Sequence, residues 1–182
     1  NEYSISLRFM AIKILELWIY KWFDKLSVED SENIKVGVVD LVLNHPSLYS
    51  GYNGSRPLRS KLSKVLSEIG KKMYPDRWNS YISDLFQLWN EDNNNNNNDN
   101  NIYTCHIGIL SFRFLLEDIT DSDTFNTTSN VNGYISSSRR EAIITAFKEP
   151  SLQYNCIASM YNILSNFANQ CSNNSTGNNN DN

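Results

Sequence analysis

KKMYPDRWNSYISDLFQLW, residues 71–89, contains the clearest structural signal in this chain. After Pro75, apolar side chains recur with the spacing of one face of an α-helix. They are Trp78, Tyr81, Ile82, Leu85, Phe86 and Trp89. The preceding stretch has the same period, with Leu58, Leu62, Val65, Ile69 and Met73. Because Pro75 cannot continue a helix, the two stretches predict an antiparallel helical hairpin with a very short turn.

One hairpin cannot bury both of its apolar faces, so it needs neighbours of the same kind. Periodic segments on either side supply them. The predicted helices are Tyr3–Asp24, Val28–His45, Pro57–Lys72, Arg77–Trp89, Ile102–Ile119 and Arg139–Gln170, the last kinked or split at Pro150. The sequence therefore predicts an all-α protein, an α-α superhelix of about three HEAT/armadillo-like hairpins, with repeats of about fifty residues.

The first and fifth predicted helices carry apolar residues on much of their circumference, so we expect each to pack on more than one side. In the last helical region the expected core residues are Ile143, Phe147, Met160, Ile163, Leu164 and Phe167. The repeats should occupy residues 1–171. Residues 91–101, an asparagine tract, and 172–182, an Asn/Ser tail, have nothing to bury and are predicted to be disordered. Since the pattern starts inside a helix without an initiator Met, we expect a fragment of a longer chain, or a processed or wrongly bounded gene product.

Composition excludes several classes of protein. The net charge of −4 and the pI of about 5.2 argue against a protein that coats nucleic acid by bulk charge. The longest apolar stretch, residues 9–23, contains Lys13, Glu16 and Lys21, so no membrane insertion is expected. Three cysteines without paired spacing, and no secretory signal, predict reduced thiols in an intracellular protein.

No arrangement of residues predicts chemistry. Cys105 and His106 are neighbours, but adjacent helical residues point about 100° apart, so Cys105 is interpreted as a core residue rather than a nucleophile. The remaining metal-ligand types, His45, Cys156 and Cys171, are scattered, whereas zinc sites use close pairs. No phosphate-binding glycine loop is present. We therefore predict no enzyme activity, no cofactor and no metal.

Two further sets of residues have a functional and a structural interpretation. Four tryptophans could stack on nucleobases, but their places on or beside the apolar faces favour packing. These are Trp18, Trp22, Trp78 and Trp89. Four lysines of the third helix could form a basic strip, but a solvated outer face is the preferred interpretation. These are Lys61, Lys64, Lys71 and Lys72.

Four segments resemble the importin-β-like exportin (karyopherin) family. YKWFDKL followed by ENIKVGVVDLV (residues 20–42) is similar to the second repeat of exportins. KKMYPDRWNSYISDLF (71–86) resembles the basic-aromatic-Pro-x-x-Trp turn of the third repeat. ILSFRFLLEDIT (109–120) and Arg139-Arg140-Glu141 resemble the two helices that follow. The resemblance covers residues 5–168 and, within the family, is strongest to the N-terminal HEAT repeats of exportin five, a carrier of structured RNA.

The resemblance implies a nuclear transport receptor that shuttles between nucleus and cytoplasm. It implies Ran-GTP as a partner of the inner helices, here Val28–His45, Arg77–Trp89 and the helix starting at Arg139. A protein or structured-RNA cargo would bind elsewhere on the full arch, and nucleoporins are further partners that the resemblance allows. The residues pointing away from the apolar stripes of these inner helices are the candidate partner-facing set: Glu32, Lys35, Asn79, Ser83, Asp84, Gln87, Arg139 and Arg140.

Two alternatives remain open at the level of the sequence. The first is a helical-repeat scaffold with a protein partner other than Ran. The second is a helical repeat that binds RNA directly, which a salt-dependent affinity for hairpin RNA would support.

Overall fold

The computed structural model describes residues 2–50, 55–90, 98–120 and 136–176, and every regular element within these ranges is a helix. The all-α prediction is confirmed. In chain order the elements are α1 (Glu2–Trp22), the 3-10 helix η1 (Phe23–Lys25), α2 (Val28–Asn44), the 3-10 helix η2 (Pro46–Leu48), α3 (Ser55–Met73), α4 (Tyr81–Asn90), α5 (Asn98–Thr120), α6 (Ser137–Phe147) and α7 (Pro150–Thr176).

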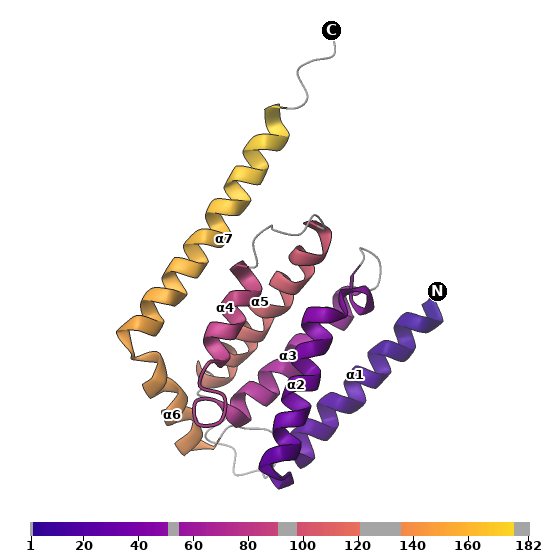
Figure 1. Ribbon diagram of the computed structural model, residues 1–182, viewed down its shortest axis with the longest axis vertical. Coiled ribbons are helices and arrows are strands. Elements are labelled where there is room, and N and C mark those ends of the chain that lie inside the picture. The colour runs from indigo at the N-terminus through magenta and orange to yellow at the C-terminus, as the bar shows by residue number, and fades with distance from the viewer. Residues whose placement is uncertain (1, 51–54, 91–97, 121–135, 177–182) are drawn as a thin grey trace.

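The long helices form two layers (Figure 1). In one layer α3 lies between α1 and α5 and packs closely against both. In the other layer α4 packs against α7, and α4 also rests on α5. Helix α2 belongs to this second layer and covers α3. This arrangement is the one expected of stacked helical hairpins.

Local sequence sets several helix ends. The side chain of Ser27 accepts a hydrogen bond from the backbone N–H of Asp30, which caps α2. Pro46 follows the last turn of α2 and opens η2. Pro150 begins α7, so the predicted long C-terminal helix is split there into α6 and α7.

Other helix boundaries differ from the prediction. Helix α4 begins at Tyr81 rather than Arg77, because the N–H groups of Arg77 and Trp78 both donate to the carbonyl of Met73 and hold residues 74–80 in a turn. The Tyr74–Pro75 peptide bond in this turn is cis.

Helix α5 already begins at Asn98, and α7 continues to Thr176, so both extend into segments predicted to be disordered. An existing helix adds residues far more easily than a new helix starts, which explains both extensions. The rest of the asparagine tract (91–97), residues 121–135 and the end of the tail (177–182) lie outside the described residues.

The apolar face of residues 78–89 forms the centre of the core, as predicted. Two glycines allow its aromatic rings to approach the first layer. A Cβ on Gly70 of α3 would stand 2.2 Å from a ring carbon of Tyr81, and one on Gly108 of α5 would stand 2.6 Å from the ring of Trp89. The two glycines are therefore required for close packing between the layers.

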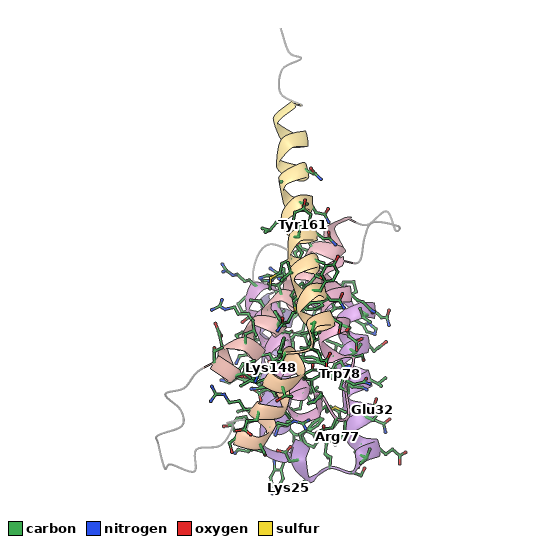
Figure 2. The ribbon with its side chains drawn as sticks, turned by 90° about the vertical axis from the view of Figure 1, so that its left-hand side faces the viewer. Lys25, Glu32, Arg77, Trp78, Lys148 and Tyr161 are labelled. Atoms are coloured by element: carbon green, nitrogen blue, oxygen red, sulfur yellow. The ribbon has the colours of Figure 1, made fainter. Side chains whose placement is uncertain are left out.

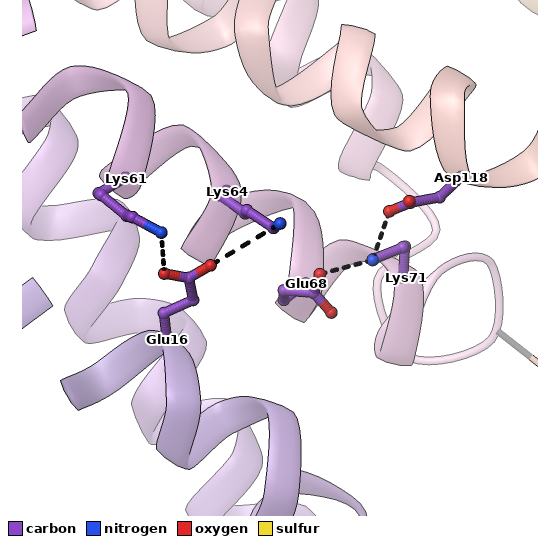
Figure 3. Close-up of polar contacts among 6 residues, drawn as sticks. All are labelled: Glu16, Lys61, Lys64, Glu68, Lys71 and Asp118. Atoms are coloured by element: carbon purple, nitrogen blue, oxygen red, sulfur yellow. Dashed lines mark hydrogen bonds and ion pairs between the residues drawn. The ribbon is translucent and has the colours of Figure 1, made fainter. Parts of the chain in front are cut away.

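Helix α3 is buried on almost every side, including several of its charged residues. Lys71, whose side chain is only 5% exposed, donates to Glu68 on its own helix at 2.6 Å and to Asp118 on α5 at 2.5 Å (Figure 3). On the opposite flank Lys61 and Lys64 approach Glu16 of α1 at 2.7 and 3.9 Å. Ion pairs thus connect α3 to both of its neighbours in the layer.

For Lys61, Lys71 and Lys72 these ion pairs correct the interpretation as a solvated outer face, whereas Lys64 is exposed, as that interpretation expects. Lys71 is buried, and Lys72 pairs with Asp24 of η1. The sequence pattern placed the lysines off the apolar stripe, but it did not show that α1 and α5 would cover their face as well. The lysines serve packing between helices.

The ends of the layers depart from the expected core. The prediction that α5 packs on more than one side is confirmed, because α3, α4, α2 and α6 all contact it. For α1 the prediction is wrong within this chain, since the face that carries Leu7, Met10, Ile14, Leu17, Trp18 and Trp22 is exposed. In α7 the expected core residues Met160 and Leu164 are exposed, together with Tyr154, Ile157 and Tyr161, whereas Ile143 of α6 is buried. The side chain of Phe167 lies outside the described residues.

The close approach of Tyr81 predicts a cost for any side chain at position 70. We expect Gly70→Ala to lower the free energy of unfolding by about 2 kcal/mol, because overpacking costs about 1–3 kcal/mol and outweighs the better helix propensity of alanine. Urea unfolding followed by tryptophan fluorescence measures the change.

The matched control is Gly37→Ala in α2, where a Cβ would meet no atom within 4 Å. Helix propensity alone acts there, so this variant should be more stable by about 0.5–1 kcal/mol. Equal effects of the two substitutions would contradict the proposed contact with Tyr81.

Removal of Lys71 should be costly, because it leaves Glu68 charged, buried and unpaired. We expect Lys71→Met to lower the free energy of unfolding by about 3 kcal/mol, and a second substitution, Glu68→Met, to restore much of it. Lys64→Met, which removes the longer and more exposed ion pair, should change stability by less than about 0.5 kcal/mol. If Lys71→Met is as harmless as Lys64→Met in chemical unfolding, the buried pair does not stabilise the fold.

Candidate partner-binding surface

The predicted partner-facing residues all come from α2, the 78–90 segment and α6. Figure 2 views the molecule from the α7 side, on which Tyr161 lies, and labels Glu32, Arg77 and Trp78, which fall near one another in this view. A hydrogen bond of 3.2 Å from Arg77 to the hydroxyl of Ser31 joins the N-terminal part of α2 to the turn before α4. The structure therefore brings part of the predicted set together across that junction.

Trp78 is the centre of this cluster. Its indole N–H donates to the carboxylate Oδ2 of Asp84 at 2.6 Å, and the hydroxyl of Ser80 donates to the same oxygen at 3.0 Å. The ammonium group of Lys35 lies 5.3 Å from the centre of the indole ring and forms an ion pair with Glu32. A buried tryptophan thus holds charges of both signs at the junction of α2 and α4.

The uncharged members of the set border this cluster. Asn79 lies in the turn before α4, and Ser83 and Gln87 lie on α4 itself. All three are exposed, which is what a contact with a partner requires.

The two arginines have a different role. Arg139 donates to the backbone carbonyls of Lys71 and Lys72 at 3.1 and 2.7 Å and also contacts Asp76. Arg140 donates to the carbonyl of Ile119 at 2.7 Å. The carbonyls that end a helix have no partner within it, and cationic side chains there interact well with the helix dipole. Arg139 and Arg140 cap α3 and α5, so their guanidinium groups are used inside the molecule.

A groove separates α2 from α4 and has α3 as its floor. Its volume is about 120 Å³, and its walls are mainly apolar. The lining residues are Val39, Val42, Leu43, Leu66, Trp78, Asp84, Leu85, Gln87 and Leu88. Sequence reasoning missed this groove. The residue that could have indicated it is Leu43, an apolar side chain at the edge of the α2 stripe that is exposed in the structure.

A second feature that the sequence did not reveal is a buried polar network at the other end of α3. Arg59, which is 8% exposed, donates to the carbonyl of Tyr49 at 2.9 Å and to Nδ1 of His106 at 3.3 Å. The hydroxyl of Tyr49 donates to the carbonyl of Val42 and lies 3.2 Å from that of Thr104. The network fastens α2, α3 and α5 together.

His106 is held by this network, and its neighbour Cys105 packs against the apolar core. Burial raises the pKa of the Cys105 thiol, which keeps it protonated. Burial, assisted by Arg59 and Arg56, lowers the pKa of His106. Cys156 is also a free thiol, and burial raises its pKa to about 11. Neither thiol has the lowered pKa of an activated nucleophile.

Trp78 and Trp89 are buried, which confirms packing as their role, whereas Trp18 and Trp22 are exposed, contrary to that interpretation. Within residues 2–50, 55–90, 98–120 and 136–176, no three metal-ligating side chains gather at one place. None of the helices in these ranges is both long and apolar enough to cross a membrane.

The lowered pKa of His106 predicts a pH dependence of stability. Below a pH of about 6.5, the ordinary pKa, the unfolded chain takes up a proton that the folded chain resists. Stability should therefore be full above this pH and fall as the pH drops below it. His106→Asn keeps an acceptor for Arg59 and cannot be protonated, so it should reduce the loss in melting temperature between pH 7.5 and pH 5.5. Identical losses in both proteins would rule out this role.

Comparison with known proteins gives one family and several relatives. The family described as Exportin 1-like protein matches residues 55–179. Protein EXPORTIN 1A of Arabidopsis thaliana is 30% identical over 86 residues, which is 47% of this chain and 8% of the relative. Exportin-T of Coprinopsis cinerea is 25% identical over 117 residues, which is 64% of this chain and 11% of the relative. Protein EXPORTIN 1B of Arabidopsis thaliana is 30% identical over 86 residues, 47% of this chain and 8% of the relative.

No solved structure matches the chain significantly. The chain spans about a tenth of the length of the relatives that it matches. The family match begins at α3 and includes the two-layered arrangement from α3 to α7. Because this match covers more than half of the sequence, and because the helices stack as a helical-repeat protein requires, the chain belongs to the exportin 1-like family.

Proposed function

We propose that this chain is part of a nuclear export receptor that binds Ran-GTP through the layer formed by α2, α4 and α7. It would thereby take part in carrying a protein or structured-RNA cargo out of the nucleus. Binding of Ran-GTP and of cargo would favour the same curvature of the helical stack, so each would raise the affinity for the other. The chain would perform no chemistry of its own.

The observation that supports this proposal most strongly is the polar cluster around Trp78. Within this layer, charged side chains of α2 and α4 stand at one junction, and exposed polar residues of α4 border it. Membership of the exportin 1-like family points to the same class of protein. The proposed contact set consists of Glu32, Lys35, Asn79, Ser83, Asp84 and Gln87, without the two capping arginines.

The charges of the chain favour a protein partner over direct RNA binding. The lysines of α3, the richest run of basic residues, form ion pairs with Glu16, Glu68, Asp118 and Asp24. Lysines that are paired in this way release few counterions from a phosphate backbone. The net charge of −4 acts in the same direction.

The test is capture of Ran by the full-length protein, with Ran loaded either with GTP or with GDP. We expect capture of the GTP form only. Reversal of two charges, Lys35→Glu with Asp84→Lys, should weaken this capture at least about tenfold, the effect of losing charged contacts in an interface. Equilibrium binding of fluorescent Ran measures the change.

The matched control reverses an exposed pair on the other layer, Arg113→Glu with Glu117→Arg, whose side chains bond to each other at 2.7 Å. It should leave capture of Ran-GTP unchanged. Equal capture of Ran-GTP and Ran-GDP would favour a helical-repeat scaffold with another protein partner. If capture depends on the nucleotide but is unchanged by Lys35→Glu with Asp84→Lys, Ran-GTP binds at a different surface.

Three finer points remain predictions. They are the particular resemblance to exportin five, the binding of nucleoporins and shuttling between nucleus and cytoplasm. Retention of a hairpin RNA only in the presence of Ran-GTP would support the first point, and RNA binding that needs no Ran would favour the direct RNA-binding alternative.

A further inference from the structure

The groove between α2 and α4 has the size and the walls of a site for one apolar side chain. An enclosed apolar cavity of about 150 Å³ can hold a benzene molecule, and this groove has a volume of about 120 Å³. Val39 and Leu43 form one wall, Leu85 and Leu88 form the other, and Leu66 of α3 closes the floor. A leucine or isoleucine side chain would be desolvated there on several sides.

The charge in the lining of the groove is negative. Asp84 forms part of the wall itself, and both hydrogen bonds of its carboxylate, from Trp78 and Ser80, go to Oδ2. Oδ1 therefore keeps acceptor capacity. On α2, the carboxylate of Asp40 already accepts from Asn44 and lies 3.4 Å from His45, and the charge of Lys35 is balanced by Glu32, so the charge offered to a partner is that of Asp84. A basic group beside the bound apolar side chain fits this distribution of charge.

We infer that this groove binds a segment of a partner protein that presents a leucine-sized apolar side chain with an arginine or lysine beside it. The apolar side chain fills the space between α2 and α4, and the basic group pairs with Asp84. Gln87 lies on the same wall, and its amide can bond to the backbone of the segment. An amphipathic helix laid into a groove is a known mode of peptide recognition. The inference deepens the proposed function, because the groove lies in the layer assigned to Ran-GTP.

The experiment uses the full-length protein and three fluorescein-labelled peptides. The first has leucines at helical spacing with an arginine beside each, the second has glutamate in place of arginine, and the third has serine in place of leucine. We expect fluorescence anisotropy to detect the first peptide alone, with an affinity that falls as salt is added. Asp84→Asn keeps the acceptor for Trp78. It should lower the affinity for the first peptide about fivefold, the effect of losing one exposed ion pair.

Leu43→Ser should also lower the affinity for the first peptide about fivefold, because it removes part of the apolar wall. The matched control is Glu117→Gln, a carboxylate-to-amide change on α5 outside the groove, which should have no effect. The inference is overturned if the glutamate peptide binds as well as the arginine peptide, if none binds, or if Asp84→Asn and Leu43→Ser behave like the control. If the protein self-associates and Leu43→Ser abolishes that self-association, the occupant of the groove is a second copy of the protein, and the inference is also overturned.

Capture of Ran-GTP by the same variants separates this inference from the proposed function. If the arginine peptide binds as expected but Ran-GTP is not captured, the groove inference stands and the proposed function falls. If Ran-GTP is captured but no peptide binds, the proposed function stands and the groove inference falls.

Discussion

Helix α3 is covered on almost every side, so its charged residues need partners inside the molecule. Lys71 finds two carboxylates, and Arg59 finds a carbonyl and an imidazole nitrogen. For Lys71, burial alone would lower the pKa, but the attraction of Glu68 and Asp118 outweighs burial, so the pKa is raised and the side chain stays charged. Because a buried charge is tolerated only with such partners, these contacts position α5 beside α3. On the other flank of α3, the ion pair of Lys61 with Glu16 connects it to α1.

The close packing of the second layer on the first depends on one glycine in α3 and one in α5. Gly70 and Gly108 leave room for the rings of Tyr81 and Trp89, so α4 can approach the first layer closely. Helix α6 then places Arg139 and Arg140 over the carboxyl ends of α3 and α5. The polar cluster around Trp78 and the groove beside it are consequences of this placement. A rigid junction of this kind suits a surface that recognises a partner, since little ordering is needed on binding.

The two ends of the stack differ from its centre. Exposed apolar side chains line α1 and α7, whereas the helices between them bury most of theirs. Helical repeats bury their faces only against neighbouring repeats, so these surfaces have the chemistry of stacking faces. The periodicity identified them as apolar in both cases, yet only the arrangement of the helices shows which of them are covered within this chain.

Local sequence determined the helices, their period and several of their ends, because hydrophobic spacing, proline and capping residues act over a few positions. Pro150 and Ser27 are examples. It also placed Asp84 on the candidate contact surface and Trp78 in the core, and it carried enough family resemblance to indicate an exportin. The tertiary structure alone decided that Lys71 is buried, that Arg139 and Arg140 cap other helices, and that a groove lies between α2 and α4. Those outcomes depend on contacts between residues far apart in the chain, and a helical period specifies a face without specifying what the face meets.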